Sequence, residues 1–211
     1  EDADIDCSVN GDAFIRTPEN TYSLSSISWM GPHQCRNAGL SIRAAELSPR
    51  FELEAGHVQT GLEQVENLAG LRARMETIRQ NPTVVLDVAH NDESLCATLR
   101  ACLARFERID HVFFGLMKDK TFDAFASALS KLGIPVSILE LGSERAFAPA
   151  DLGAQLRDQG VLVHQDSLPV NAVLDTIQRL YPRESVVLIL GSYQIAGAIL
   201  QREACKSRTS K

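Results

Sequence analysis

The 211-residue sequence lacks both glycine-rich phosphate-binding signatures, GxGxxG and GxxxxGK(S/T). Without the first, a dinucleotide-binding dehydrogenase is disfavoured, and without the second, the chain has no P-loop of its own. The five cysteines form no CxxC or CxxxC pair of the kind that binds zinc. We therefore interpret them as reduced thiols. No pair among His57, His111 and His164 has metal-ligand spacing, so we read them as structural and expect no metal site.

Acidic residues outnumber basic ones, and long apolar runs are scarce. The net charge is -6 and no long basic run occurs, which argues against a nucleic-acid partner. No stretch approaches the ~20 apolar residues of a membrane span, and the start EDADID lacks the order of a signal peptide. We therefore expect a cytoplasmic protein without membrane contact, and a disordered tail at residues 206–211.

Short β-branched runs alternate with helix-length amphipathic segments from residue 83 onward. This pattern predicts an α/β fold with a doubly wound, mostly parallel Rossmann-like sheet. Several runs are apolar on both faces, as expected of strands covered by helices on each side. The expected strands span residues 83–88, 111–116, 134–141, 161–164 and 185–190, and the expected helices lie near 92–106, 121–132, 150–158, 169–181 and 192–205.

The first 80 residues follow a different pattern, rich in turn-forming residues. They predict two or three short strands, with Asn10-Gly11 as a hairpin turn, and helices near 33–47 and 59–69. Residues 70–80 are expected to be a connector. Because so short a segment makes a marginal domain, we expect residues 1–78 to be part of a larger domain and residues 79–205 to be the α/β domain.

A buried-strand pattern at the start of TVVLDVAHNDESL gives way abruptly to polar side chains. Asn91 can cap the following helix, and the carboxylates of Asp92 and Glu93 suit the positive end of its dipole. That explanation leaves out Asp87 and His90, which would lose hydration at a strand end without a partner. Ligands of open α/β sheets bind at the carboxyl ends of strands, so we interpret Asp87 and His90 as ligand-facing.

The kind of ligand group follows from charge. The turn after Asp87 has no glycine and several carboxylates, which disfavours phosphate and favours a ribose hydroxyl, an amide or a cationic side chain. Arg74 is an electrostatic partner that could meet phosphate. Lys120 and Ser192 each follow another expected strand and are candidate substrate contacts at the same sheet edge. Ser192 is also explained as a helix cap, with Gly197 allowing close helix packing.

In four segments the chain resembles the folylpolyglutamate synthase and dihydrofolate synthase family, which is related to the Mur peptide ligases. One segment is similar to the family's Gly-x-His-Gln-x-x-Asn-Ala sequence and another to its Asp-x-Ala-His-Asn motif. The segments follow one another in the family's order through most of the chain. They are MGPHQCRNAGLSIRAAEL (30–47), VVLDVAHN (84–91), FFGLMKDKTFDAF (113–125) and LILGSYQIAGAIL (188–200).

The resemblance implies ATP-dependent amide formation, in which a folate carboxylate is phosphorylated and the amine of L-glutamate attacks the acyl phosphate. It implies a central ATP-binding domain that ends near residue 78, followed by a carboxyl-terminal domain of the Mur ligase type. Asp87, His90 and Arg74 match family positions near the nucleotide, as does Asn37 in the segment that also holds His33. His90 is the candidate catalytic residue, and Mg²⁺ would be bound mainly by the family's P-loop half.

Three departures from the family's pattern affect these expectations. Residues 71–74 read Leu-Arg-Ala-Arg where the family has Trp-Pro-Gly-Arg, and Asp92 replaces a proline. The P-loop half is absent, so we expect the carboxyl-terminal portion of a longer synthase, inactive alone, whose other half lies on the same or a partner chain. The alternatives are a fragment of a Mur-type peptide ligase and a stand-alone nucleotide-binding or regulatory module without catalysis.

Overall fold

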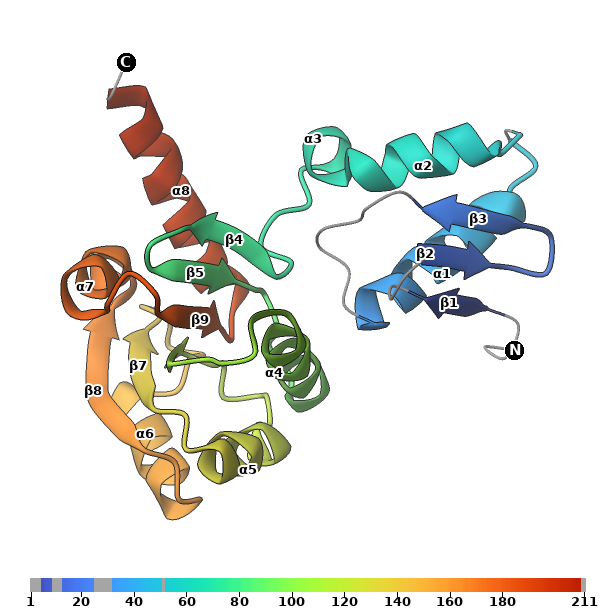
Figure 1. The fold of residues 1–211 in the computed structure, drawn as a ribbon. Coiled ribbons are helices and arrows are strands. Elements are labelled where there is room, and N and C mark those ends of the chain that lie inside the picture. Colours follow the sequence, from blue (N-terminus) through green and yellow to red (C-terminus); the bar gives the residue numbers. More distant parts are fainter. Residues whose placement is uncertain (1–4, 9–12, 25–31, 51, 210–211) are drawn as a thin grey trace. The chain divides into compact units, whose positions relative to one another are not determined.

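The computed structural model describes residues 5–8, 13–24, 32–50 and 52–209. The chain forms two compact units that divide between Arg72 and Ala73 (Figure 1). This division precedes the boundary expected after residue 78, because residues 76–79 form a strand in the sheet of the second unit.

The first unit is a small antiparallel sheet with helices. Its strands β1 (Asp6–Ser8), β2 (Ala13–Arg16) and β3 (Thr21–Leu24) pair in sequence order, and its helices are α1 (Pro32–Glu46), α2 (Ala55–Glu63) and α3 (Val65–Ala69). The expected strands and helical segments are present, although α2 begins before residue 59. Asn10-Gly11 lies outside the described residues. The core of this unit consists of Ile15, Tyr22, Cys35, Ala38, Ile42 and Val58.

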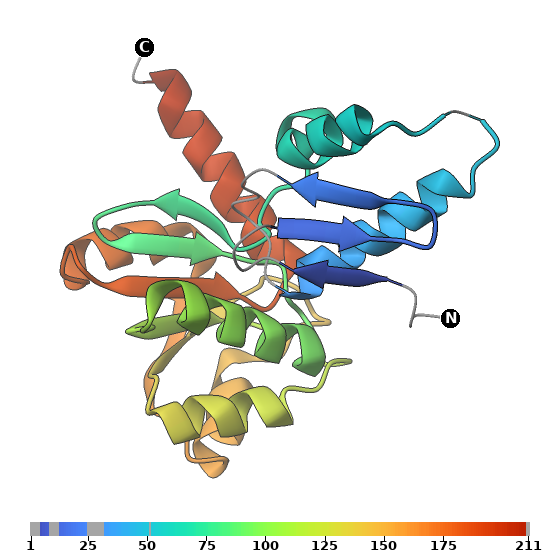
Figure 2. The ribbon, with the colours of Figure 1, turned by 45° about the vertical axis from the view of Figure 1, so that its right-hand side comes forward.

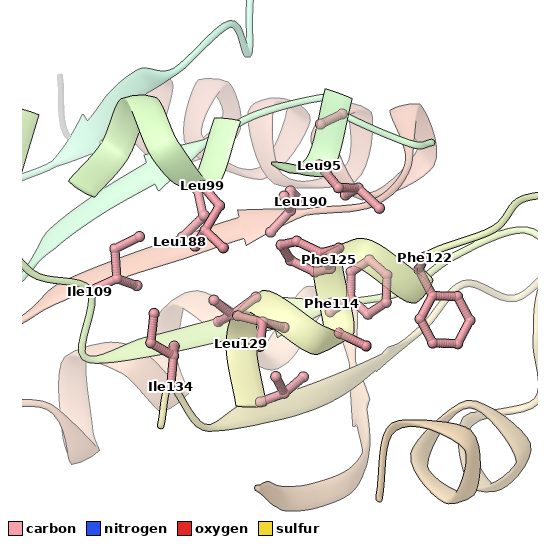
Figure 3. Close-up of a cluster of buried hydrophobic side chains, with 14 of the residues drawn as sticks. Leu95, Leu99, Ile109, Phe114, Phe122, Phe125, Leu129, Ile134, Leu188 and Leu190 are labelled. Atoms are coloured by element: carbon pink, nitrogen blue, oxygen red, sulfur yellow. The ribbon is translucent and has the colours of Figure 1, made fainter. Parts of the chain in front are cut away.

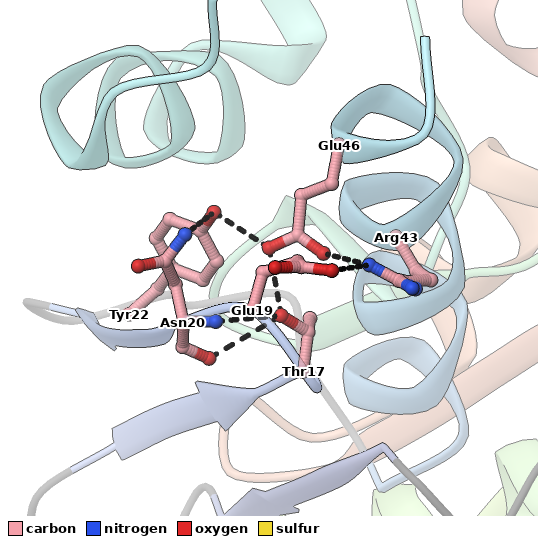
Figure 4. A network of polar contacts seen from close by, with 6 residues as sticks. All are labelled: Thr17, Glu19, Asn20, Tyr22, Arg43 and Glu46. Carbon is pink, nitrogen blue, oxygen red and sulfur yellow. Dashed lines mark hydrogen bonds and ion pairs between the residues drawn. The ribbon is translucent and has the colours of Figure 1, made fainter.

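The buried carboxylate of Glu46 links the end of α1 to the strands through hydrogen bonds. Glu46, whose side chain is 4% exposed, accepts hydrogen bonds from Thr17 Oγ1 at 2.7 Å and Tyr22 Oη at 2.8 Å (Figure 4). Arg43 bridges Glu46 at 3.1 Å and Glu19 at 3.2 Å. Burial acts to raise the pKa of Glu46, but the three donors outweigh it and the pKa is lowered. The charge is therefore compensated inside the unit.

The second unit is built on a six-stranded sheet of order β4-β5-β9-β6-β7-β8. Only the β4–β5 pair is antiparallel, so the expected doubly wound, mostly parallel sheet is confirmed. Strand β9 lies between β5 and β6, which are consecutive along the chain. The strands are β4 (Glu76–Arg79), β5 (Thr83–Leu86), β6 (His111–Phe114), β7 (Val136–Glu140), β8 (Val163–Pro169) and β9 (Val186–Leu190).

Helices cover both faces of this sheet (Figure 1, Figure 2). Val85 packs on one face with the three helices α4, α5 and α6. Figure 3 shows part of this cluster, including Leu95 of α4 and Phe125 of α5. Val84 and Leu86 pack on the opposite face with α7 and α8. This alternation along β5 follows the two-residue period of a strand. The helices are α4 (Asp92–Phe106), α5 (Asp123–Leu132), α6 (Pro149–Asp158), α7 (Val173–Leu180), preceded by a 3-10 turn, η2 (Val170–Ala172), and α8 (Tyr193–Thr209).

Three segments differ from the sequence-based expectation. The connector expected at 70–80 contains β4, and the strand expected at 161–164 is the longer β8 (residues 163–169). Both are outer strands of the sheet and pair with a neighbour on one side only. Because they are less buried than central strands, they need no continuous apolar run. Helix α8 continues to Thr209, so residues 206–209 of the expected tail are helical.

Candidate functional site

The carboxyl ends of β5, β9 and β6 lie side by side, and two glycines allow a close backbone approach there. Gly191, directly after β9, has φ +116, and a Cβ at this position would lie 2.1 Å from the carbonyl oxygen of Gly115. A Cβ on Gly115 would lie 2.8 Å from the oxygen of Leu139. Side chains larger than glycine would therefore force these strand ends apart.

Asp87 lies behind this edge in the protein interior. It is 3% exposed, and its oxygens accept hydrogen bonds from the backbone N–H groups of Met75 and Ala89, each at 2.7 Å, and from Thr98 Oγ1 at 3.2 Å. Burial raises the pKa of Asp87, while these donors and the charge of Arg74 oppose the rise. This arrangement favours a positioning role for Asp87, and its expected contact with nucleotide stays a prediction.

The loop that Asp87 holds carries Arg74. The residues on either side, Ala73 (φ 56) and Met75 (φ 51), are both in the left-handed region. Their amides are fixed, because Ala73 N donates to Glu76 Oε2 at 2.8 Å and Met75 N donates to Asp87. A non-glycine residue in this region costs on the order of 1–3 kcal/mol and persists only where its surroundings impose it. The loop therefore presents Arg74 from a defined, strained backbone.

We expect an Ala73→Gly variant to be more stable than the wild type by about 0.5–1 kcal/mol, because glycine adopts a positive φ without a Cβ clash. Glycine is also the residue at this position of the family's Trp-Pro-Gly-Arg sequence. Urea unfolding measures the change. In the matched control, Ala97→Gly in α4, the same substitution should cost about 1 kcal/mol. An Ala73→Gly variant that loses stability would contradict the strain argument.

His90 lies just beyond Asp87 and is half-buried. Its Nδ1 is 3.0 Å from the carbonyl oxygen of Val88. Since a carbonyl oxygen only accepts, the hydrogen of this contact is on Nδ1. The ring also lies against Tyr193, with centroids 4.9 Å apart. These two contacts orient the imidazole at the sheet edge.

His90, Lys120 and Ser192 line one pocket of about 330 Å³. Ser192 is 3% exposed, and its Oγ accepts a hydrogen bond from Gln194 N at 3.1 Å at the start of α8. It thus has the expected cap-like contact and also faces the pocket. Lys120 Nζ is 3.0 Å from Asp119. The structure therefore brings together three predicted residues from the ends of β5, β6 and β9.

The polar residues after His90 divide between two helices. Asn91 caps α4 as expected, since its Oδ1 accepts from Ser94 N at 2.9 Å. Asp92 does more than support the same helix. Its oxygens accept from Ala124 N at 2.9 Å and Phe125 N at 2.8 Å, in the first turn of α5. A proline at position 92 could not make these contacts.

We expect Asp92→Ala to destabilise the protein by about 1–2 kcal/mol, because two backbone N–H groups of α5 lose their acceptor. Hydrogen exchange at the Ala124 and Phe125 amides should accelerate, and urea unfolding gives the total loss. Glu93→Ala is the control, because Glu93 is an exposed residue of the same turn. Equal losses in the two variants would show that Asp92 acts only on the α4 dipole.

Asn37 belongs to the other unit. It is exposed on α1, and its Nδ2 lies 3.4 Å from Oε1 of Gln34. The side chain of His33 lies outside the described part of the structure. Within the described ranges, no group of three or more His, Cys, Asp or Glu side chains could hold a metal ion. Nor is any helix in those ranges long and apolar enough to cross a membrane.

Sequence reasoning missed Arg145, Tyr193 and Gln194, which line the same pocket. Arg145 follows β7 in the segment LGSERAFAP, so the rule that drew attention to Lys120 applies to it equally. Gly197 was expected to allow close helix packing. That interpretation is wrong, because a Cβ there would have no neighbour within 4 Å among the described residues.

Comparison with known proteins assigns the second unit to a family. Residues 73–193 match the family described as Mur ligase, glutamate ligase domain. A probable bifunctional folylpolyglutamate synthase/dihydropteroate synthase of Haloferax volcanii is 29% identical over 93% of this chain and 24% of its own length. The dihydrofolate synthase/folylpolyglutamate synthase of Bacillus subtilis is 28% identical over 89% of this chain and 43% of its own length.

Solved structures show the same fold. Folylpolyglutamate synthase of Mycobacterium tuberculosis, complexed with ADP and AMPPCP, has a TM-score of 0.73 and 21% identity over 94% of this chain and 46% of that one. The bifunctional enzyme of Yersinia pestis has a TM-score of 0.71 and 20% identity over 95% and 46%. The chain thus spans less than half the length of these relatives. Since the family match covers more than half of the chain, the protein belongs to the Mur ligase family through its glutamate ligase domain.

Proposed function

We propose that this chain is part of an ATP-dependent ligase that adds L-glutamate to a folate through an acyl phosphate. The observation that carries the proposal is the pocket shared by His90, Lys120 and Ser192 on a domain of the glutamate ligase type. The names of the relatives, folylpolyglutamate and dihydrofolate synthases, support the choice of folate. Folate and L-glutamate would be the small-molecule substrates.

The pocket residues have properties that suit amino-acid binding. The Lys120 ammonium and the Ser192 hydroxyl can hold the α-carboxylate, since both donate hydrogen bonds and one is charged. His90 Nε2 can accept a hydrogen from the amine that attacks the acyl phosphate. No metal is needed for these three contacts, which serve to bind and orient the amino acid.

ATP and Mg²⁺ are the proposed cofactors. Arg74 would approach the phosphates from its strained loop, which Asp87 holds in place, and Asn37 in the first unit would contact the nucleotide. We propose that this unit is part of the central ATP-binding domain. The P-loop and the principal Mg²⁺ ligands would come from residues outside this sequence, in the same or a partner chain. The described thiols Cys96 and Cys102, which form no disulfide, support a cytoplasmic setting.

The decisive test is to combine the chain with a P-loop half, encoded upstream or in a neighbouring frame. ATP affinity by isothermal titration and ADP release are measured with and without folate and L-glutamate. We expect ADP release that requires both substrates, and a loss of at least about tenfold in kcat/KM for glutamate in Lys120→Gln. Lys131→Gln, on the exposed side of α5, is the control and should behave like the wild type.

Other outcomes would support other functions. ADP release that requires a peptide precursor of the cell wall in place of folate would indicate a Mur-type peptide ligase. Tight ATP binding without turnover, under every combination of substrates, would indicate a nucleotide-binding or regulatory module.

A further inference from the structure

Arg145 is a second cation at the pocket that also holds Lys120. It lies in the loop between β7 and α6, is exposed, and contributes to the lining of the same pocket as His90 and Ser192. An arginine side chain in a pocket is adapted to planar anions, because its guanidinium donates two parallel hydrogen bonds to one carboxylate. Its presence therefore raises the question of which anion it binds.

The backbone around Arg145 is held firmly against the loop that follows β6. Its carbonyl oxygen accepts from Lys118 N at 2.8 Å, and Lys118 Nζ donates to the carbonyl oxygen of Glu144 at 3.0 Å. Met117 and Ala146 form an antiparallel bridge beside them. Because both loops are fixed to each other, the guanidinium projects from a defined base at the pocket, which lowers the entropic cost of binding.

The charges that line the pocket do not cancel. Two cations, Lys120 and Arg145, face a single carboxylate, Asp119. Lys120 Nζ lies 3.0 Å from that carboxylate. The charge of Arg145 also acts on Asp119, although Arg145 makes no ion pair within 4 Å in the described part of the chain. The two cations therefore outnumber the single carboxylate of the lining, so the pocket carries one excess positive charge and favours an anionic ligand.

We propose that Arg145 is a specificity-determining residue that binds the side-chain carboxylate of the incoming amino acid. This inference rests on the proposed function, in which Lys120 and Ser192 hold the α-carboxylate common to all amino acids. Selection among amino acids requires a group that contacts their side chains. Arg145 is the cation of the lining that is not assigned to the α-carboxylate. A guanidinium fits a carboxylate bidentately but gains far less from a neutral amide, so the pocket selects glutamate over glutamine.

The test is a titration of the ¹⁵N-labelled 211-residue chain with L-glutamate, L-glutamine and L-alanine, followed at the Gly191 and Ser192 amides. We expect the wild type to prefer glutamate over glutamine by at least about tenfold, as for a charge-assisted hydrogen bond. In Arg145→Gln, glutamate affinity should fall to that of glutamine, while glutamine affinity stays the same. Arg183→Gln, which removes an exposed arginine that does not line the pocket, should keep the wild-type preference.

Two results would overturn the inference in distinguishable ways. An Arg145→Gln chain with the wild-type preference for glutamate would exclude the role of Arg145 and leave the amino-acid pocket intact. A wild-type chain whose Gly191 and Ser192 amides respond to none of the three amino acids would exclude the pocket itself, and the role of Arg145 with it.

Discussion

Gly191→Ala should destabilise the protein by about 3–5 kcal/mol, the largest effect that we expect from a single methyl group in this chain. The added Cβ would meet the carbonyl oxygen of Gly115 at 2.1 Å, and backbone atoms cannot rotate away as a flexible side chain can. The φ of +116 adds strain for any residue with a Cβ. Because Gly191 also lines the pocket, the surviving folded molecules should bind ligand more weakly.

Urea unfolding monitored by circular dichroism measures this loss, and Gly197→Ala provides a matched control from the same segment. A methyl group at Gly197 has no neighbour within 4 Å, and the residue lies inside α8. That variant should gain roughly 0.5–1 kcal/mol from the better helix propensity of alanine. If the free energy of unfolding of Gly191→Ala lies within about 1 kcal/mol of the wild-type value, the strand ends of β6 and β9 are not as close as described.

The second largest loss of stability that we expect is caused by acid and arises from His111 in the second unit. His111 is 1% exposed, its Nε2 lies 2.9 Å from Ser137 Oγ, and its ring contacts Phe113, His164 and Tyr181. Burial, with a smaller contribution from the charge of His164, lowers its pKa from 6.5 to about 4. The unfolded chain therefore binds this proton more readily than the folded chain does.

The sign of the effect follows directly. The contribution of neutral His111 to stability is fully present above pH 6.5 and is lost as the pH falls toward 4. A shift of this size corresponds to roughly 3 kcal/mol. We expect the free energy of unfolding to fall between pH 7 and pH 4 in both proteins. The fall should be larger in the wild type than in His111→Gln, by this amount. Parallel pH profiles of the two proteins would show that His111 can be protonated without unfolding.

The central strands were predictable because their surroundings demand apolar side chains. Strands β5, β6 and β9 have sheet neighbours on both sides and helices on both faces, so VVL, VFF and VVLIL are almost wholly buried. Their carboxyl ends then point to His90, Lys120 and Ser192 by the general rule for open sheets. The cap formed by Asn91 was also predictable, because it is a local contact.

Features that depend on distant partners could not be read in this way. Asp87 looked like a ligand contact because its three donors come from Met75, Ala89 and Thr98, and only the fold brings the first and last of these to it. Asp92 was assigned to one helix because its second role needs α5, some thirty positions further along the chain. Non-local hydrogen bonds leave no periodic trace in a sequence.

The polar character of the two outer strands has a consequence for behaviour at high concentration. An open sheet ends in rows of unsatisfied backbone groups, which can pair with a second molecule and start aggregation. Strand β8 presents the exposed run from His164 to Ser167, and its Asp166 pairs with Arg157 of α6. Strand β4 places Arg79 against Glu203 of α8 at 2.6 Å. Charged side chains at both outer strands therefore discourage edge-to-edge association of two molecules.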